Sequence, residues 1–133
     1  MMKFDRKVML PDTDAAGILF FGNYLKLAHD AYETFMDAIG FSLAWIIDEA
    51  EFMVLIAHAE ADYLSSLRLG ADYALVLTVE KLGQTSFTIK YDYVAEGGDK
   101  VATARSVHVI VNKKSGKPTR LPEALKERLS QHS

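Results

Sequence analysis

Two carboxylates, Asp12 and Asp14, are separated by one residue in a loop-forming stretch that begins with Pro11 and ends at Gly17. An apolar run follows, and Gly22-Asn23 then has the residue types of a helix start. A carboxylate can attack a carbonyl carbon or activate water, and a helix N-terminus offers free N–H groups and about half a positive charge to an oxyanion. This pattern can therefore place a carboxylate beside donors for an oxyanion.

The same residues also have purely structural interpretations. Asp14 can cap the loop or solvate a turn, and Asp12 can shape the loop through an Asx-type hydrogen bond. Gly17 fits a turn, although its missing Cβ would also let a substrate approach closely. Asn23 is expected to cap the helix and Tyr24 to lie in the core. The residue types alone leave both interpretations open.

His58 and Glu60 form a second candidate pair, within a long stretch that alternates between two faces. Strict alternation puts Val54, Ile56 and Asp62 on the same face as this pair, opposite an apolar face. His58 and Glu60 could line an acyl or water site at an interface between subunits. They could equally form a solvated or interface pair, so this stretch does not decide between the two roles.

The other histidines show no spacing that indicates chemistry. His29 and Glu33 are one helical turn apart on a polar stripe, which predicts a surface pair. His108 and His132 have no partner that the sequence identifies. No spacing of His, Asp and Glu is typical of a metal site, so we expect neither a metal nor a cofactor.

Periodicity predicts the elements that must position these residues. Five alternating stretches are expected to be strands, at residues 4–10, 52–64, 72–82, 86–95 and 101–112. A long helix is expected over residues 23–39 with Gly40 as its stop, and its narrow polar stripe means that it must be covered on most sides. Shorter helices are expected at residues 42–51, capped by Ser42, and at 122–131. We therefore predict an α+β fold in which a curled antiparallel sheet wraps around one long helix.

Length and composition limit the class of protein. A chain of 133 residues suits a single domain, which we place at residues 1–133. The net charge of −3 and the scattered Lys and Arg give no indication of nucleic-acid binding. The absence of cysteine excludes disulfides and Cys nucleophiles. The first ten residues do not have the pattern of a signal peptide and no apolar run could span a bilayer, so we expect a cytoplasmic protein without a membrane partner.

Residues 12–24, which read Asp-Thr-Asp-Ala-Ala-Gly-Ile-Leu-Phe-Phe-Gly-Asn-Tyr, resemble the motif of the 4-hydroxybenzoyl-CoA thioesterase family of hotdog proteins. The order of the predicted elements is similar to that of the family from about residue 4 to residue 112. The resemblance implies a hotdog fold and a homodimer or homotetramer. It also implies an acyl-CoA substrate and no cofactor.

The resemblance carries roles onto particular residues. The catalytic carboxylate of the family falls on Asp14, and its oxyanion donor, a backbone amide at the helix start, falls on Phe21 or Gly22. Substrate-binding positions are expected at residues of the same motif and of the later strand, namely Gly17, Phe20, Tyr24, His58 and Glu60.

This chain departs from some relatives at the site that holds the phosphates of coenzyme A. Those relatives have a run of Arg and Lys just before the third long strand, whereas residues 83–87 here read Gly-Gln-Thr-Ser-Phe. Phosphate binding must then come from elsewhere, and the candidate basic residues are Arg68, Lys81, Arg105 and Lys113.

The resemblance implies hydrolysis of an acyl-CoA thioester. The Phe20-Phe21 pair and the aromatic helix favour a flat acyl group, such as 4-hydroxybenzoyl or 1,4-dihydroxy-2-naphthoyl. One alternative is a thioesterase that acts on aliphatic acyl groups or on acyl groups attached to an acyl carrier protein. Another is a non-catalytic hotdog protein that binds acyl-CoA, although such a protein has no need for Asp14.

Overall fold

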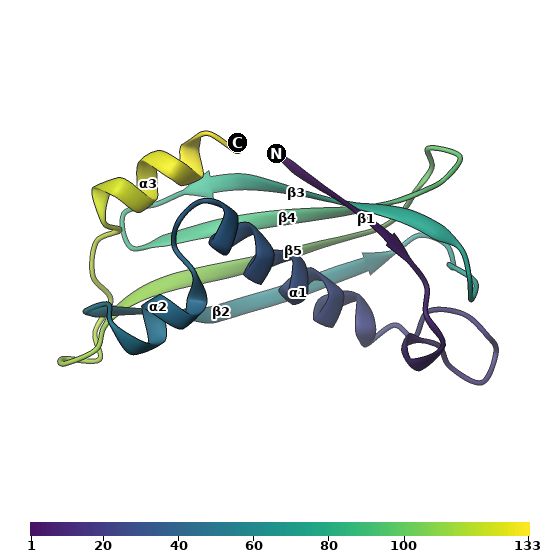
Figure 1. Ribbon diagram of the computed structural model, residues 1–133, viewed down its shortest axis with the longest axis horizontal. Coiled ribbons are helices and arrows are strands. Elements are labelled where there is room, and N and C mark those ends of the chain that lie inside the picture. The colour runs from purple at the N-terminus through teal and green to yellow at the C-terminus, as the bar shows by residue number, and fades with distance from the viewer.

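The computed structural model describes residues 1–133 and has one five-stranded antiparallel sheet with the strand order β1-β3-β4-β5-β2. Its strands are β1 (Met2–Lys7), β2 (Phe52–Tyr63), β3 (Asp72–Leu82), β4 (Ser86–Ala95) and β5 (Lys100–Asn112). The helices are α1 (Asn23–Ala38), α2 (Leu43–Asp48) and α3 (Glu123–Ser130). Figure 1 shows α1 lying across one face of the sheet, with α2 near β2 and α3 near β3. This is the hotdog arrangement that the motif implied, so the predicted fold class is confirmed.

Side chains that alternate along the strands form the core beneath α1. In β4 the buried side chains are Phe87, Ile89, Tyr91 and Tyr93, while the residues between them are partly exposed. Because successive side chains of a strand point to opposite faces, this pattern gives β4 one face toward the helix and one toward solvent. Burial of this aromatic and aliphatic face against α1 is the main contribution to the stability of the fold.

The predicted boundaries of α1 agree with the structure to within one residue, whereas α2 follows its predicted cap but ends at Asp48, three residues before the predicted end at residue 51. Gly40 adopts a φ of 92°, which a residue with a Cβ rarely takes, and it ends α1 as expected. The Ser42 side chain accepts a hydrogen bond from the Trp45 amide at 3.2 Å and caps α2. None of the helices combines the length and the apolar character needed to cross a bilayer.

The first strand was predicted too far along the chain. β1 ends at Lys7, and Leu10–Asp12 form a single 3-10 turn with Pro11 inside it. Val8 is buried and its amide donates to the Ala71 carbonyl, so the chain still runs beside the region of β3 after pairing in β1 has ended. The apolar residues after Lys7 continue the alternation without continuing the strand, which is why periodicity misplaced the boundary.

A β-bulge at Ala57 overturns the predicted faces of β2. Ile56 pairs with His108, whereas His58 pairs with Val107, so one residue of β2 is left without a partner. The extra residue reverses the alternation and puts Val54 and Ile56 on the helix-covered face. His58 and Glu60 therefore point to the other face of the sheet, away from α1.

Candidate active site

A tight loop in front of α1 carries Asp14. The Asp14 amide donates to the Ile18 carbonyl at 2.9 Å, and the Gly17 amide donates to the Asp14 carbonyl at 3.1 Å. Gly17 has a φ of 75°, which explains the glycine at the turn, and no atom lies within 4 Å of where its Cβ would be. The Leu69 amide donates to the Gly17 carbonyl, so the segment after β2 anchors this loop.

The two carboxylate oxygens of Asp14 lie in different environments. Oδ1 accepts hydrogen bonds from the Ala16 amide at 2.8 Å and the Ile18 amide at 3.4 Å. Oδ2 has no hydrogen-bond partner, and the side chain is exposed. The loop-capping interpretation of Asp14 is therefore correct for one oxygen. The other oxygen is free to meet a carbonyl carbon or a water molecule.

The start of α1 offers free donors, as required for an oxyanion site. The amides of Phe21 and Gly22 make no backbone hydrogen bond, and neither donates to a side chain. Gly22 is the N-cap and has no side chain to occupy its own helix terminus. A Cβ at Gly22 would lie 2.9 Å from the Phe20 ring, so the glycine leaves space for that ring. These two amides can donate to an oxygen that enters from solvent.

Asn23 does not cap the helix, contrary to the prediction from its residue type. Its Nδ2 donates to the Asp12 carbonyl at 2.9 Å, and the Phe20 amide donates to the same carbonyl at 2.9 Å. Asp12 thus contributes through its backbone. Two hydrogen bonds on one carbonyl fix the loop of Asp14 relative to the first turn of α1, which lies beside the loop in Figure 1.

Aromatic side chains surround the helix start. The rings of Phe20 and Phe21 lie 4.6 Å apart and remain 41% and 63% exposed, so both can contact a ligand. Tyr24 is buried against Tyr63 and Tyr93, in agreement with its core interpretation. Tyr63, which the sequence did not single out, donates from its hydroxyl to the Phe21 carbonyl at 2.8 Å and packs against the Phe21 ring. Its place at the end of a predicted strand gave no indication of this contact.

His58 and Glu60 form a pair on the opposite face of the sheet. Their side chains approach to 3.2 Å, and both are about half exposed. The chain does not bring them to Asp14. Their predicted part in substrate binding therefore stays a prediction, one that requires a contribution from a second subunit.

The four basic residues considered for coenzyme A differ in how they are engaged. Arg105 makes two hydrogen bonds to Glu80, at 2.8 and 3.1 Å, and Lys113 donates to the carbonyls at the end of α2. Lys81 is near the end of β3 that is farther from Asp72 and the loop. Arg68 is exposed without an ion pair, and it forms a β-bridge with Ile18 in the loop of Asp14.

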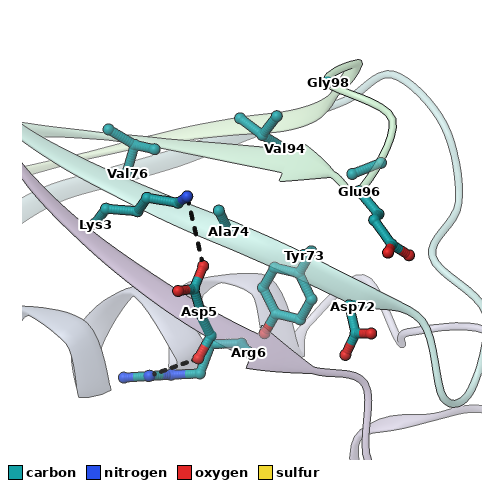
Figure 2. Close-up of a pocket in the computed structure, with 11 residues that line it drawn as sticks. Lys3, Asp5, Arg6, Asp72, Tyr73, Ala74, Val76, Val94, Glu96 and Gly98 are labelled. Carbon is teal, nitrogen blue, oxygen red and sulfur yellow. Dashed lines mark hydrogen bonds and ion pairs between the residues drawn. The ribbon is translucent and has the colours of Figure 1, made fainter.

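The largest hollow of the surface is separate from this site. It has a volume of about 530 Å³ and lies over β1, β3 and the end of β4. Figure 2 shows its charged lining, in which Lys3 and Asp5 pair with each other beside Tyr73 and Asp72. Asp14 and the free amides of α1 are not among its lining residues, and the hollow is open to solvent.

Two smaller hollows lie between α1 and β2 and have a buried polar floor that the sequence did not predict. Their volumes are about 290 and 200 Å³, and both are lined by His29 and Ile56. Ser106 lies on the floor of the larger one and His108 on that of the smaller one. His29 stacks near Tyr32 and makes no ion pair with Glu33, so the predicted surface pair is wrong. The alternation of β5 could have placed Ser106 and His108 on one face, but it could not show that this face is covered.

The fold and the site define a thioesterase of the hotdog type. The family model of the thioesterase-like superfamily matches residues 8–129, and the chain belongs to this superfamily. A 1,4-dihydroxy-2-naphthoyl-CoA hydrolase from Rippkaea orientalis is 35% identical over 127 residues, which cover 94% of this chain and 92% of that protein. A hydrolase of the same name from Crocosphaera subtropica is 34% identical over 122 residues, 90% of this chain and 89% of that protein.

A solved structure supports the same assignment. The crystal structure of a 1,4-dihydroxy-2-naphthoyl-CoA thioesterase from Synechocystis matches with a TM-score of 0.90 and 27% identity, covering 96% of this chain and 94% of that one. The predicted class of enzyme, an acyl-CoA thioester hydrolase, is confirmed by these relatives.

Proposed function

We propose that this chain hydrolyses an aromatic acyl-CoA, with 1,4-dihydroxy-2-naphthoyl-CoA as the leading candidate substrate. The observation that carries the proposal is the Asp14 carboxylate, which has one oxygen held by the loop and one free, next to a helix start with two free amides. The choice of acyl group is based on the relatives from Rippkaea orientalis and Crocosphaera subtropica, since both are named for that substrate.

In the proposed reaction Asp14 acts as nucleophile or general base on the thioester carbonyl. The Phe21 or Gly22 amide donates to the oxyanion that develops, aided by the dipole of α1. Coenzyme A leaves as a thiolate. A thiolate is a good leaving group, so no general acid is needed to protonate it. The exposed rings of Phe20 and Phe21 contact the flat acyl group. Gly17 has no side chain, so the approach of the acyl group to Asp14 is not blocked there.

We propose that Arg68 binds the phosphates of coenzyme A. It is the candidate basic residue that combines an unpaired guanidinium with a position beside the Asp14 loop. A guanidinium can bind phosphate oxygens through two parallel hydrogen bonds. Arg105 and Lys113 would each have to give up hydrogen bonds to do the same.

The proposed active form is a cytoplasmic homodimer or homotetramer. β2 is an edge strand of twelve residues, and its exposed side chains include Met53 and Leu55. An exposed apolar edge of this length is a template for pairing with another strand. Pairing with β2 of a second copy would cover these residues and bring the partner's surface near the Tyr63 end of the strand, where the Asp14 loop lies.

A hydrolysis panel tests the proposed function. Benzoyl-, naphthoyl-, hexanoyl- and palmitoyl-CoA are compared by the release of free thiol. We expect kcat/KM for the aromatic substrates to be several-fold higher, because aromatic packing is worth ~0.5–1.5 kcal/mol beyond area burial. A clear preference for palmitoyl-CoA would refute the aromatic assignment and leave the thioesterase standing. Binding of acyl-CoA with no hydrolysis of any substrate would favour the non-catalytic alternative.

A further inference from the structure

The larger hollow between α1 and β2 exists because small side chains face one another there. Ala28 of α1 and Ala59 of β2 line its walls together with Leu25 and Ile56, and Ser106 and Tyr91 lie at its floor. Its volume of about 290 Å³ exceeds the roughly 150 Å³ of an apolar cavity known to hold one benzene ring. The space therefore suits a flat ring system of one or two rings.

The floor of this hollow belongs to a chain of buried hydrogen bonds. The Tyr91 hydroxyl lies 2.9 Å from Ser106 Oγ, and Ser106 Oγ lies 2.7 Å from His108 Nε2. The three residues are 1%, 6% and 1% exposed. His108 is stacked between the rings of Tyr32 and Phe87, at 4.2 and 4.8 Å, which fixes its imidazole in place.

This series of three hydrogen-bonded residues has one more polar hydrogen than it has hydrogen bonds. Neutral Tyr91, Ser106 and His108 carry one polar hydrogen each, and only two hydrogen bonds join them. If the chain donates toward His108, the spare hydrogen is on Nδ1, which is buried without a partner. If His108 donates toward Ser106, the spare hydrogen is on the hydroxyl of Tyr91, and Tyr91 and its partner Ser106 both line the hollow. A buried donor left without an acceptor is costly, so an acceptor in the hollow favours the second arrangement.

The floor carries no charge at neutral pH. Burial lowers the pKa of His108 to about 3, with a further lowering from nearby His29. Burial also raises the pKa of Tyr91 to about 12, so its hydroxyl keeps its proton. A neutral donor at this buried floor suits a neutral oxygen, and the Lys26 ammonium of the lining already pairs with Asp30.

We propose that Tyr91, set by Ser106 and His108, is a specificity-determining residue that donates a hydrogen bond to a hydroxyl on the ring of the bound acyl group. The inference rests on the proposed function, because it places the ring of the same acyl-CoA in this hollow. Leu25 and His29 lie three and seven residues beyond Gly22, roughly 5–10 Å along the helix axis. A carbonyl at the helix start would thus put the far side of an aromatic acyl group level with the hollow.

The close Ser106–His108 pair does not have the features of a second nucleophile and base. Its His108 Nδ1 has no carboxylate or carbonyl to orient it, and a histidine with so low a pKa is a weak base. The geometry therefore indicates recognition.

The test compares substrates that differ by one ring hydroxyl. Benzoyl-CoA and 2-naphthoyl-CoA are each measured against their hydroxylated isomers, and the quantity of interest is the ratio of kcat/KM within a pair. We expect at least one hydroxyl position to raise this ratio about 10-fold in the wild type, the size of one hydrogen bond. Tyr91→Phe should bring the ratio close to one. Tyr93→Phe is the matched control, since Tyr93 is equally buried on the same strand, does not line the hollow and should leave the ratio as in the wild type.

Binding of the free acids provides a readout that does not depend on hydrolysis. Calorimetric titration with 2-naphthoate and its hydroxylated isomers should show the same ratio in Kd and its loss in Tyr91→Phe. A ratio near one in the wild type, or an unchanged ratio in Tyr91→Phe, overturns the inference while hydrolysis leaves the proposed function intact. Loss of all hydrolysis in Ser106→Ala, with the fold retained, would instead make Ser106 a nucleophile. Absence of hydrolysis with the binding ratio present would refute the proposed function alone.

Discussion

At the scale of single residues, the central feature of the site is that the two carboxylate oxygens of Asp14 differ in their hydrogen bonding. Asp14 Oδ1 accepts two backbone hydrogen bonds, so the loop holds the side chain in one orientation. Oδ2 has no hydrogen-bond partner, and in the proposed reaction it meets the substrate in an orientation that is set beforehand. Such preorganisation lowers the cost of bringing a reacting group into position.

Asp14→Asn tests whether the structural role of Oδ1 can be separated from the proposed catalytic role of Oδ2. The amide oxygen of Asn can still accept from Ala16 and Ile18, so the loop should keep its shape while the negative charge is lost. We expect kcat to fall by ~10² or more with little change in the free energy of unfolding. Steady-state kinetics and a denaturation curve of the same preparation measure the two effects.

Asp12→Asn is the matched control for that variant. The hydrogen bonds that involve Asp12 in the loop use its backbone carbonyl, which the substitution keeps. Its effect on kcat should therefore be much smaller. Equal losses in the two variants would show that the catalytic role had been given to the wrong carboxylate.

At the scale of elements, the junction of loop and helix decides where the proposed oxyanion donors lie. The Asn23 side chain and the Phe20 amide both donate to the Asp12 carbonyl. This ties the segment before the loop to the first turn of α1. The position of the free amides relative to Asp14 is consequently a property of two elements joined by side-chain and backbone hydrogen bonds.

Asn23→Asp tests the junction. Asp has the same size but no donor, so the bond to the Asp12 carbonyl is lost and two oxygens face each other. We expect kcat to fall about 3- to 10-fold, with KM changed less, because the donors to the oxyanion are displaced. Glu33→Ala, further along on the exposed face of α1, should leave kcat near the wild-type value. A kcat that is unchanged in Asn23→Asp would mean that the junction does not position the site.

At the scale of the whole molecule, the edge strand β2 and the buried His108 are the features with the largest consequences. β2 is left with exposed apolar side chains that no other part of the chain covers. His108 lies among aromatic rings on the helix-covered face of the sheet and depends on that burial for its neutral state.

The oligomeric state follows from the edge strand. We expect sedimentation velocity to show a dimer or a dimer of dimers, because two β2 strands can satisfy their free backbone groups against each other. Leu55→Asp should weaken that assembly, since it puts a charge on the exposed apolar part of the strand, and kcat/KM should fall in parallel. A monomeric wild-type protein with full activity would contradict this expectation.

The stability of the protein should depend on pH through His108. Its folded pKa of about 3 lies below the unfolded value near 6.5, so the unfolded chain binds a proton that the native state excludes. The contribution to stability is therefore complete above pH 6.5 and is lost as pH falls from 6.5 toward 3, by on the order of 5 kcal/mol at most. Urea denaturation between pH 7 and 4 measures it.

His108→Gln provides the reference for that measurement. Gln keeps a polar group near Ser106 but does not titrate, so the difference in unfolding free energy between wild type and variant should shrink on acidification. Groups common to both proteins cancel in this difference. A difference that stays constant with pH would show that His108 is not the group responsible.

Much of the local structure could be predicted because its causes are local. β3 and β4 occur at the predicted residues, since alternation with period two is a property of neighbouring side chains. The C-terminal end of α1 and the cap of α2 follow from Gly40 and Ser42. The loop that carries Asp14 and the start of α1 could be located from residue types, because Pro, Asp and Gly favour loop geometry within a few residues, whereas the catalytic role of Asp14 stays a prediction from the resemblance.

The remaining features depend on contacts between residues far apart in the chain. One extra residue at Ala57 reverses the faces of β2, and it is visible only from the pairing with β5. The bond from Asn23 to the Asp12 carbonyl replaced the expected cap because the folded loop brings that acceptor within reach. His108 looked unpartnered in the sequence, and only the covering of its face by α1 made it a buried, neutral member of a hydrogen-bonded chain. The sequence thus determined which elements form, whereas burial and pairing across the sheet decided what those elements hold together.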